Sequence, residues 1–421
     1  MTQVEYPTNT FETLPTETPT ETQPTQTLPR QRSCPFDPPA RVAELQAEAP
    51  VSQLALPGGY RGWLVTRYDD VRSVLADQRF TTDRSRVNSP IREIPEELRR
   101  ATQPGMFISQ DPPEHTRYRK LLTGQFTVRR MRELSSRIEE FVTERLDAMV
   151  AAGPPADLVE MFALPVPSLV ICELLGVDYD DRAEFQERTA KLLRLETSLE
   201  EVRQVGEGIK DFMLRLVRDK RERPTDDMIS GLITGAAGPT GEGLTDEELS
   251  NMSLLLLVAG HETTANMLGL STMALLEHPD QLDRLRADPS LIPGAVEELL
   301  RYLSILQMGA VRVAQEDIEL GGQLIREGQT VILHIPQANR DPEHYGEPDR
   351  LDVTRTRVRH VAFGHGVHQC LGQQLARVEL VVGLTTLLER FPTLRLAVPP
   401  EEIPMREDMA IYGAHKLPIS W

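Results

Sequence analysis

The chain has 421 residues, 40% of them hydrophobic, which is enough for a large buried core. Its net charge of −18 argues against nucleic-acid partners, which select basic surfaces. Three cysteines, Cys34, Cys172 and Cys370, are far apart and odd in number, so we expect no disulfide framework and a cytoplasmic location. No stretch of about 20 uninterrupted apolar residues exists, so no membrane anchor is expected.

The first 35 residues differ from the rest in composition. They are rich in Thr and Pro, carry few apolar side chains and are expected to be disordered. They also lack the basic start and apolar run of a signal peptide. No Pro- or Gly-rich linker divides the remainder, so residues 36–421 are predicted to form a single large domain.

Apolar periodicity predicts a mainly α domain with minor β sheets. Pro57-Gly58-Gly59 is expected to form the turn of a hairpin. Helical periodicity dominates from residue 131 to residue 300. The best-defined helices are expected over residues 69–76, 131–150, 246–276 and 371–391. Strands are expected over residues 53–55, 63–66, 311–314, 318–320, 330–333, 394–397 and 414–417.

Unusual residues stand at the centre of the long apolar helix predicted over residues 246–276. Gly260 costs about 1 kcal/mol relative to alanine there, and the Glu262 carboxylate is unfavourable in apolar surroundings unless it is paired. A distorted, hydrated turn beside a ligand would explain both, together with Thr263. Alternatively, Thr263 and Thr264 bond back to the preceding turn and Glu262 lies at the helix surface. His261 is expected to face a neighbouring helix, with a contact to substrate or water as the alternative.

A single cysteine, Cys370, stands between a glycine-containing loop and a predicted helix. Gly364 and Gly366 allow the loop to fold back under a flat ligand, and Gly372 leaves the first helical turn bare. The helix N-terminus favours a thiolate. One thiolate with no second cysteine nearby suits an iron held by a porphyrin, which needs only an axial ligand from the protein.

Two other interpretations of Cys370 are possible. His360, His365 and His368 could join it in a zinc site, but zinc motifs usually show paired ligands at short spacing. The glycine-containing loop would also have no purpose in a zinc site. A buried structural cysteine is the commonest fate of an intracellular cysteine, and the complete loop pattern makes this the less favoured interpretation.

The run from Phe363 to Gly372 fills every fixed position of F-G-x-G-x-H-x-C-x-G, the haem-thiolate signature of the cytochrome P-450 family. Further motifs follow in the expected order, so the chain after about residue 35 resembles that family, and most of all its soluble bacterial members from actinomycete-type organisms. The resemblance implies the family fold, a large helical domain with a small β-rich part. It also implies haem b (iron protoporphyrin) as the cofactor, with Cys370 as its axial ligand.

The resemblance also implies roles for individual residues. Gly260 would make room for dioxygen, and Thr263 and Glu262 would deliver protons to it. Glu298 and Arg301, three residues apart on one helix face, match the E-x-x-R element that fastens this helix to residues 350–359. The side chains expected to bind the haem propionates are His115, Arg119, Arg312 and His368. The loop residues expected to contact haem are Phe363, Gly364 and Gly372.

The implied activity is a monooxygenase that inserts one oxygen atom of O₂ by hydroxylation or epoxidation. An apolar pocket lining suits a bulky, mostly apolar natural product such as a macrolide, another polyketide or a terpenoid, as in antibiotic and other secondary metabolite biosynthesis. The residues expected around this pocket are Ile91, Ile94, Met106, Phe107, Leu256, Val258, Leu306, Met308, Ala410 and Ile411.

Electrons are expected from a ferredoxin and a separate ferredoxin reductase, since the chain carries no flavin or nicotinamide domain. Two arginine clusters in this acidic chain would dock the ferredoxin by complementary charge. They are Arg129, Arg130 and Arg132, and Arg355, Arg357 and Arg359. Two alternatives remain: a peroxide-using peroxygenase, against which the Glu262–Thr263 pair argues, and a non-enzymatic haem-binding sensor or partner protein.

Overall fold

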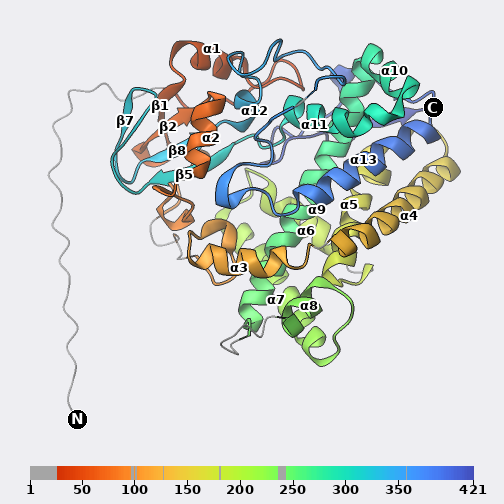
Figure 1. The fold of residues 1–421 in the computed structure, drawn as a ribbon, viewed down its shortest axis with the longest axis horizontal. Coiled ribbons are helices and arrows are strands. Elements are labelled where there is room, and N and C mark those ends of the chain that lie inside the picture. Colours follow the sequence, from red (N-terminus) through yellow and green to blue (C-terminus); the bar gives the residue numbers. More distant parts are fainter. Residues whose placement is uncertain are drawn as a thin grey trace.

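The computed structural model describes residues 26–95, 99, 102–126, 128–179, 182–235, 243–356 and 358–421. A large helical body and a smaller β-rich part make up these residues (Figure 1). The prediction of a mainly α chain with minor sheets is confirmed. The helices are α1 (Ala40–Glu48), α2 (Tyr68–Ala76), α3 (Glu114–Thr123), α4 (Val128–Ala152), α5 (Pro165–Leu175), α6 (Arg182–Leu193), α7 (Leu199–Glu222), α8 (Met228–Gly235), α9 (Asp246–Glu277), α10 (Pro279–Ala287), α11 (Ile292–Leu303), α12 (Ile335–Ala338) and α13 (Gln373–Arg390).

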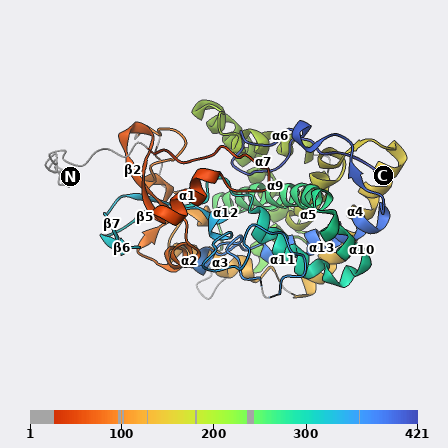
Figure 2. The same ribbon diagram turned by 90° about the horizontal axis from the view of Figure 1, so that it is seen from above.

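The long helix α9 organises the helical body. A reciprocal cap starts it: the Thr245 hydroxyl accepts the Glu248 N–H at 3.1 Å, and the Glu248 carboxylate accepts the Thr245 N–H at 2.7 Å. Because apolar residues occur all round the helix, it can be buried on every side. It packs against α5, α7 and α13. Figure 2 shows α6 and α7 on one side of α9 and α2, α3 and α13 on the other.

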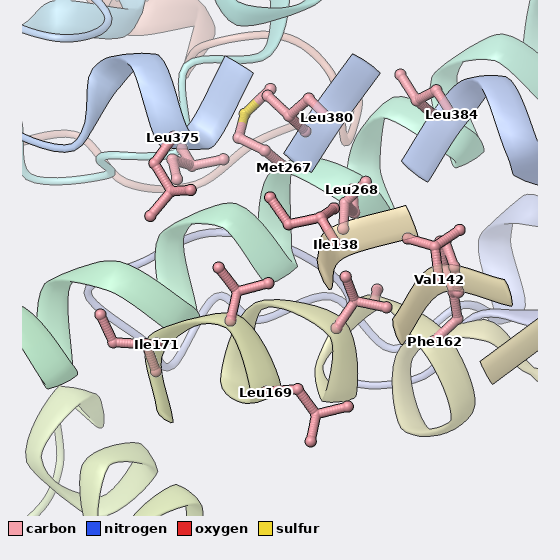
Figure 3. Close-up of a cluster of buried hydrophobic side chains, with 14 of the residues drawn as sticks. Ile138, Val142, Phe162, Leu169, Ile171, Met267, Leu268, Leu375, Leu380 and Leu384 are labelled. Atoms are coloured by element: carbon pink, nitrogen blue, oxygen red, sulfur yellow. The ribbon is translucent and has the colours of Figure 1, made fainter. Parts of the chain in front are cut away.

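The main core extends through the helical body. The part shown in Figure 3 is made by interdigitating side chains of α4, α5, α9 and α13 and of the short helical segment Val159–Ala163. The labelled members are Ile138, Val142, Phe162, Leu169, Ile171, Met267, Leu268, Leu375, Leu380 and Leu384. Within the described chain, no helix combines the length and apolar character needed to cross a membrane.

The β-rich part is built on a five-stranded sheet of order β1-β2-β8-β5-β3. The β1–β2 hairpin turns at Pro57–Gly59, where Gly58 has a φ of 78°, and β2 and β8 run parallel. The strand predicted over residues 414–417 is wrong: β10 lies further on and pairs with β4 and β9. The strands are β1 (Val51–Ala55), β2 (Arg61–Val65), β3 (Phe80–Thr81), β4 (Ala156–Asp157), β5 (Ala310–Ala314), β6 (Ile318–Leu320), β7 (Gln323–Ile325), β8 (Thr330–Leu333), β9 (Arg395–Leu396) and β10 (Pro418–Ser420).

Residues 26–35, expected to belong to a disordered tail, pack against the domain instead. Leu28 is buried beside Leu54, and the Ala55 N–H donates to the Gln26 carbonyl at 2.8 Å. The Arg32 guanidinium stacks 4.0 Å from the centre of the Tyr412 ring. The low apolar content of the first 35 residues did not indicate that these few residues anchor the segment to the domain. Residues 1–25 lie outside the described part of the chain.

A fully buried ion pair connects α11 to the segment that precedes the Cys370 loop. Arg301 Nε lies 2.7 Å from Glu298 Oε2, and neither side chain is exposed to solvent. Arg301 also donates to the Asn339 and Pro348 carbonyls, at 2.9 and 2.8 Å. Glu298 Oε1 accepts the Asp352 N–H at 3.1 Å. The pair thereby fixes the course of the chain leading to Cys370.

Replacing Arg301 with leucine should therefore destabilise the protein by about 3–5 kcal/mol, because the buried Glu298 carboxylate would lose its nearest cation and keep only the longer contact to Arg355. Denaturant unfolding would measure the change. Arg203→Leu is the matched control, since Arg203 pairs with Glu200 on the exposed surface of α7. Equal unfolding midpoints for Arg301→Leu and the wild type would contradict a supporting role for the pair.

Candidate active site

The Cys370 loop turns at its glycines and ends just before α13. Gly364 and Gly366 have φ values of 70° and 73°, which favour glycine. A Cβ on Gly366 would lie 2.7 Å from the Leu75 carbonyl of α2. The Cys370 N–H donates to the Phe363 carbonyl at 2.8 Å, which closes the loop. A Cβ on Gly372 would meet no atom within 4 Å, so space remains beside the thiol.

The protein alone does not favour a thiolate at Cys370, contrary to the expectation from the helix N-terminus. Burial raises the pKa of the thiol, although the Gly372 N–H and the charges of Arg119 and Arg377 act in the opposite direction. The helix itself begins only at Gln373. Stabilisation of the thiolate therefore has to come from a bound cation such as a haem iron.

The three histidines around Cys370 do not converge on it as a zinc site would require. His360 Nε2 lies 3.2 Å from Glu297 Oε2, and His368 Nε2 lies 3.4 Å from the Thr82 hydroxyl. Within the described ranges, no three His, Cys, Asp or Glu side chains come close enough to hold a metal ion together.

A second feature of the site is a buried group of cationic and imidazole side chains to which no carboxylate of the described residues is hydrogen-bonded. The His115 and His368 rings lie 4.2 Å apart. Both ring nitrogens of His115 are buried and have no hydrogen-bond partner among the described residues. Burial, followed by the charges of His115 and Arg312, lowers the pKa of His368 to about 3. Buried donors without hydrogen bonds lower the stability of the fold unless a ligand accepts those bonds.

Arg312 and Arg119 extend this group toward Cys370. Arg312 is buried, and among the described residues it bonds only to the carbonyl of its neighbour Val311, at 2.9 Å. Burial lowers its pKa to about 10. Burial also lowers the pKa of Arg119, against the attraction of Cys370. The nearby carboxylate, Asp111, is already bonded to Thr81 and Thr82. This donor set fits a ligand with two carboxylates, such as the propionates of haem.

The middle of α9 borders an open space. The helix is buried over residues 249–253 and again over residues 264–275. Between them, Ala259 is exposed, and Leu256, Val258 and Thr263 are only half-buried. A helix at the centre of a domain exposes its middle only where it lines a cavity. Phe363 and Cys370, in the loop before α13, are also half-buried.

The α9 helix is continuous through this region, and the predicted distorted turn is absent. The Thr263 hydroxyl donates to the Ala259 carbonyl at 2.7 Å, and that of Thr264 to the Gly260 carbonyl at 3.3 Å. These are the bonds of the structural alternative. A Cβ on Gly260 would lie 2.9 Å from Ile171 Cδ1, so close packing against α5 gives a reason for the glycine other than space for dioxygen.

Glu262, however, is buried and paired, not exposed at the helix surface. Its Oε2 lies 3.0 Å from Arg406 Nη2, and Asn266 Nδ2 donates to its carbonyl at 2.7 Å. Neighbouring His261 faces α6, where its Nε2 lies 3.1 Å from the Thr189 hydroxyl. Sequence reasoning missed Arg406, because no local pattern links residues so far apart in the chain. It also missed Asn266, although its position four residues beyond Glu262 on the same helix face was a local signal.

The residues expected around the substrate pocket lie in several surroundings. Leu306 and Ile411 form an isolated β-bridge, and Ala410 is half-buried beside them. Phe107 is buried, with its ring 6.4 Å from that of His115, and Met308 packs on the cluster around Leu54. The remaining residues, on α9 and in the loop before α3, are half-buried: Ile91, Ile94, Met106, Leu256 and Val258.

Two arginines of the expected docking clusters are engaged inside the protein. Arg355 Nε lies 3.2 Å from Glu298 Oε1, and its other nitrogens donate to backbone carbonyls. Arg130 donates to Gln125 Oε1 at 2.7 Å. These two side chains are therefore not free surface cations, whereas Arg359 is exposed. The side chains of Arg129 and Arg132, and the whole of Arg357, lie outside the described residues.

Known proteins resemble this chain over nearly its whole length. Residues 49–418 match the family model Cytochrome P-450. Cytochrome P-450-SU2 of Streptomyces griseolus is 51% identical over 397 residues, which cover 94% of this chain and 97% of that protein. Pentalenic acid synthase of Streptomyces avermitilis is 45% identical over 395 residues, with coverage of 94% and 97%.

The fold agrees with a solved relative. The crystal structure of CYP105P1 in complex with filipin I is 45% identical, with a TM-score of 0.88 and coverage of 94% of this chain and 98% of that chain. Family model, relatives and fold thus agree with the signature around Cys370 and with the buried group of cationic and imidazole side chains. The chain belongs to the cytochrome P-450 family of haem-thiolate monooxygenases.

Proposed function

We propose that this protein is a ferredoxin-dependent, cytoplasmic monooxygenase that hydroxylates or epoxidises a bulky apolar natural product of the macrolide, polyketide or terpenoid class. The observation that carries this proposal is the exposed middle of α9, where apolar Leu256 and Val258 are only half-buried near Glu262 and Thr263. Such a lining holds a large apolar molecule with few polar contacts. Relatives named pentalenic acid synthase, and a homologue solved with filipin I, support a natural-product substrate.

The proposed cofactor is haem b, with Cys370 as its axial ligand. His115, Arg119, Arg312 and His368 would hold its propionates. The unpaired ring nitrogens of His115 and the burial of Arg312 and His368 support this assignment. Gly364 and Gly372 would leave room for the flat ring. When bound, haem supplies the redox chemistry that activates dioxygen with two electrons.

The remaining chemistry belongs to the side chains of α9. Hydroxylation consumes a substrate C–H group, one O₂, two electrons and two protons, and yields the alcohol and one water. Glu262 and Thr263 are proposed to supply the protons. Glu262 is buried next to Thr263, which borders the open space, and the Thr263 hydroxyl can donate once it leaves the Ala259 carbonyl.

The electron donor is proposed to dock on the face that carries the Cys370 loop. Val367 in this loop is 41% exposed, which is unusual for a large apolar side chain. Arg72 and Arg359 are both exposed. They lie near this loop, because Arg72 acts electrostatically on His365 and both arginines act on Tyr68. An apolar contact flanked by two free cations suits an acidic iron–sulfur ferredoxin.

The reduced protein should show a strongly red-shifted Soret band with carbon monoxide, and Cys370→Ala should lose it. With ferredoxin, reductase and isotopically labelled dioxygen, the product should contain one labelled oxygen atom. Mass spectrometry measures the label. Turnover with hydrogen peroxide but none with ferredoxin and dioxygen would show a peroxygenase instead, and haem binding without turnover would favour a sensor.

Arg312→Gln should speed the loss of haem to apomyoglobin by about 10–100-fold, because a bond between charged groups contributes about 1.5–3 kcal/mol. The exposed Arg326→Gln should lose haem at the wild-type rate. Wild-type protein should also prefer haem to its uncharged dimethyl ester, and Arg312→Gln should reduce that preference. An unchanged preference would contradict propionate binding by Arg312.

The double variant Arg72→Glu/Arg359→Glu should slow reduction by ferredoxin about tenfold at low salt and less at high salt. Substrate-induced spectral shifts should keep the wild-type affinity. Arg218→Glu is the matched control, since Arg218 is an exposed arginine on α7, on the other side of α9 (Figure 2). Stopped-flow absorbance measures reduction, and equal rates in all three proteins would rule out docking at this face.

A further inference from the structure

A chain of buried polar side chains leads from Glu262 on α9 to the C-terminal loop of residues 403–414. Glu262 Oε2 lies 3.0 Å from Arg406 Nη2 and 3.3 Å from Asn266 Nδ2. Arg406 Nη1 in turn donates to Asn266 Oδ1 at 3.4 Å. All three residues are at most 7% exposed. Each of them therefore depends on the other two for hydrogen bonds that water cannot supply.

The loop that carries Arg406 is held firmly in place. The Arg406 N–H donates to the Gly413 carbonyl at 2.8 Å. Gln307 Nε2 donates to the Arg406 and Met409 carbonyls, at 3.0 and 2.6 Å. A Cβ on Gly413 would collide with the Asn266 side chain, so the loop and α9 fit closely together. The position of the Arg406 guanidinium is therefore set by the fold and does not depend on solvent.

The same loop carries candidate substrate contacts. Ala410 and Ile411 lie four and five residues beyond Arg406, and Ile411 bridges to Leu306. A substrate that displaces this loop would also displace the guanidinium that faces Glu262. The loop thus connects the pocket mechanically to the carboxylate.

The two oxygens of the Glu262 carboxylate have different surroundings. Oε2 is bound by Arg406 and Asn266. Oε1 accepts no hydrogen bond from any residue in the described part of the chain, and His261 Nε2 is 4.0 Å away and already paired with Thr189. A carboxylate anchored through one oxygen keeps the other free to accept or release a proton. The buried cation also compensates the loss of water around the charged form.

We propose that Arg406 is a positioning residue that anchors the Glu262 carboxylate through Oε2 and directs Oε1 toward proton transfer, and that it couples this carboxylate to the substrate-contacting loop. The proposal rests on the proposed monooxygenase function. Productive turnover uses two protons per O₂ to give product and water. When proton transfer does not lead to oxygen insertion, the same two electrons and two protons reduce O₂ to hydrogen peroxide, and the substrate is released unchanged.

The decisive variants are Arg406→Gln, Arg406→Lys, Glu262→Gln and the double variant Glu262→Gln/Arg406→Gln. Arg406→Gln should lower kcat about tenfold, raise the peroxide formed per electron pair, and increase the solvent deuterium isotope effect. Arg406→Lys should recover part of the loss. In the Glu262→Gln background, Arg406→Gln should have little further effect, because a residue that acts through Glu262 cannot act without it.

Gln307→Ala is the matched control, since Gln307 holds the same loop without touching Glu262. It should change substrate affinity, measured by the spin-state shift, and increase the isotope effect less than Arg406→Gln does, because the guanidinium is still present beside Glu262. Additive losses in the double variant, or an equal isotope effect in Arg406→Gln and the wild type, would overturn the proposal.

A stability measurement tests the anchor independently of turnover. Arg406→Gln should lower the melting temperature, because it leaves a buried carboxylate without its cation, and adding Glu262→Gln should restore part of it. If the wild type gives no oxygenated product, the proposed function fails, whereas the anchor is still judged by this cycle. Independent, additive shifts in melting temperature would overturn the anchor itself.

Discussion

The structure depends on how its buried arginines are hydrogen-bonded. A guanidinium keeps its charge at any pH a protein meets, so it needs acceptors wherever it is buried. Arg301 finds Glu298 and three carbonyls, and the chain ahead of Cys370 is fixed as a result. Arg406 finds Glu262 and Asn266. Arg312 is hydrogen-bonded to no carboxylate among the described residues, and this is where a ligand with carboxylates would fit. The need of a buried guanidinium for acceptors therefore explains both the fixed segment ahead of Cys370 and the cofactor site around Arg312.

The central helix α9 shows how packing and chemistry share one element. Gly260 lets it approach Ile171 of α5 closely, and the threonine hydroxyls are satisfied within the helix. Stability therefore explains most of the unusual residues at its centre. Glu262 is the exception, because the fold pairs it with a cation from another part of the chain and places it beside the exposed Ala259.

The sequence predicted what depends on local pattern and missed what depends on distant contacts. The Phe363–Gly372 run indicated both the family and the loop geometry, since glycine φ values are a local property. Arg406 and Glu262 are 144 residues apart, so no motif could join them. Arg355 looked like a free surface cation because the sequence does not show that Glu298 takes it up. Residues 26–35 looked disordered because only a few of them anchor the segment.

The group around His115 and Arg312 has opposite consequences for the empty and the loaded protein. Without anions, its buried donors oppose folding, since each is desolvated with no compensating bond. A ligand with two carboxylates turns the same donors into attractive contacts, so binding energy becomes folding energy. The Glu298–Arg301 pair, satisfied by the chain itself, supports both states alike. Loss of haem from this protein therefore has two separable causes: weaker contacts to the ligand, or a weaker scaffold beneath Cys370.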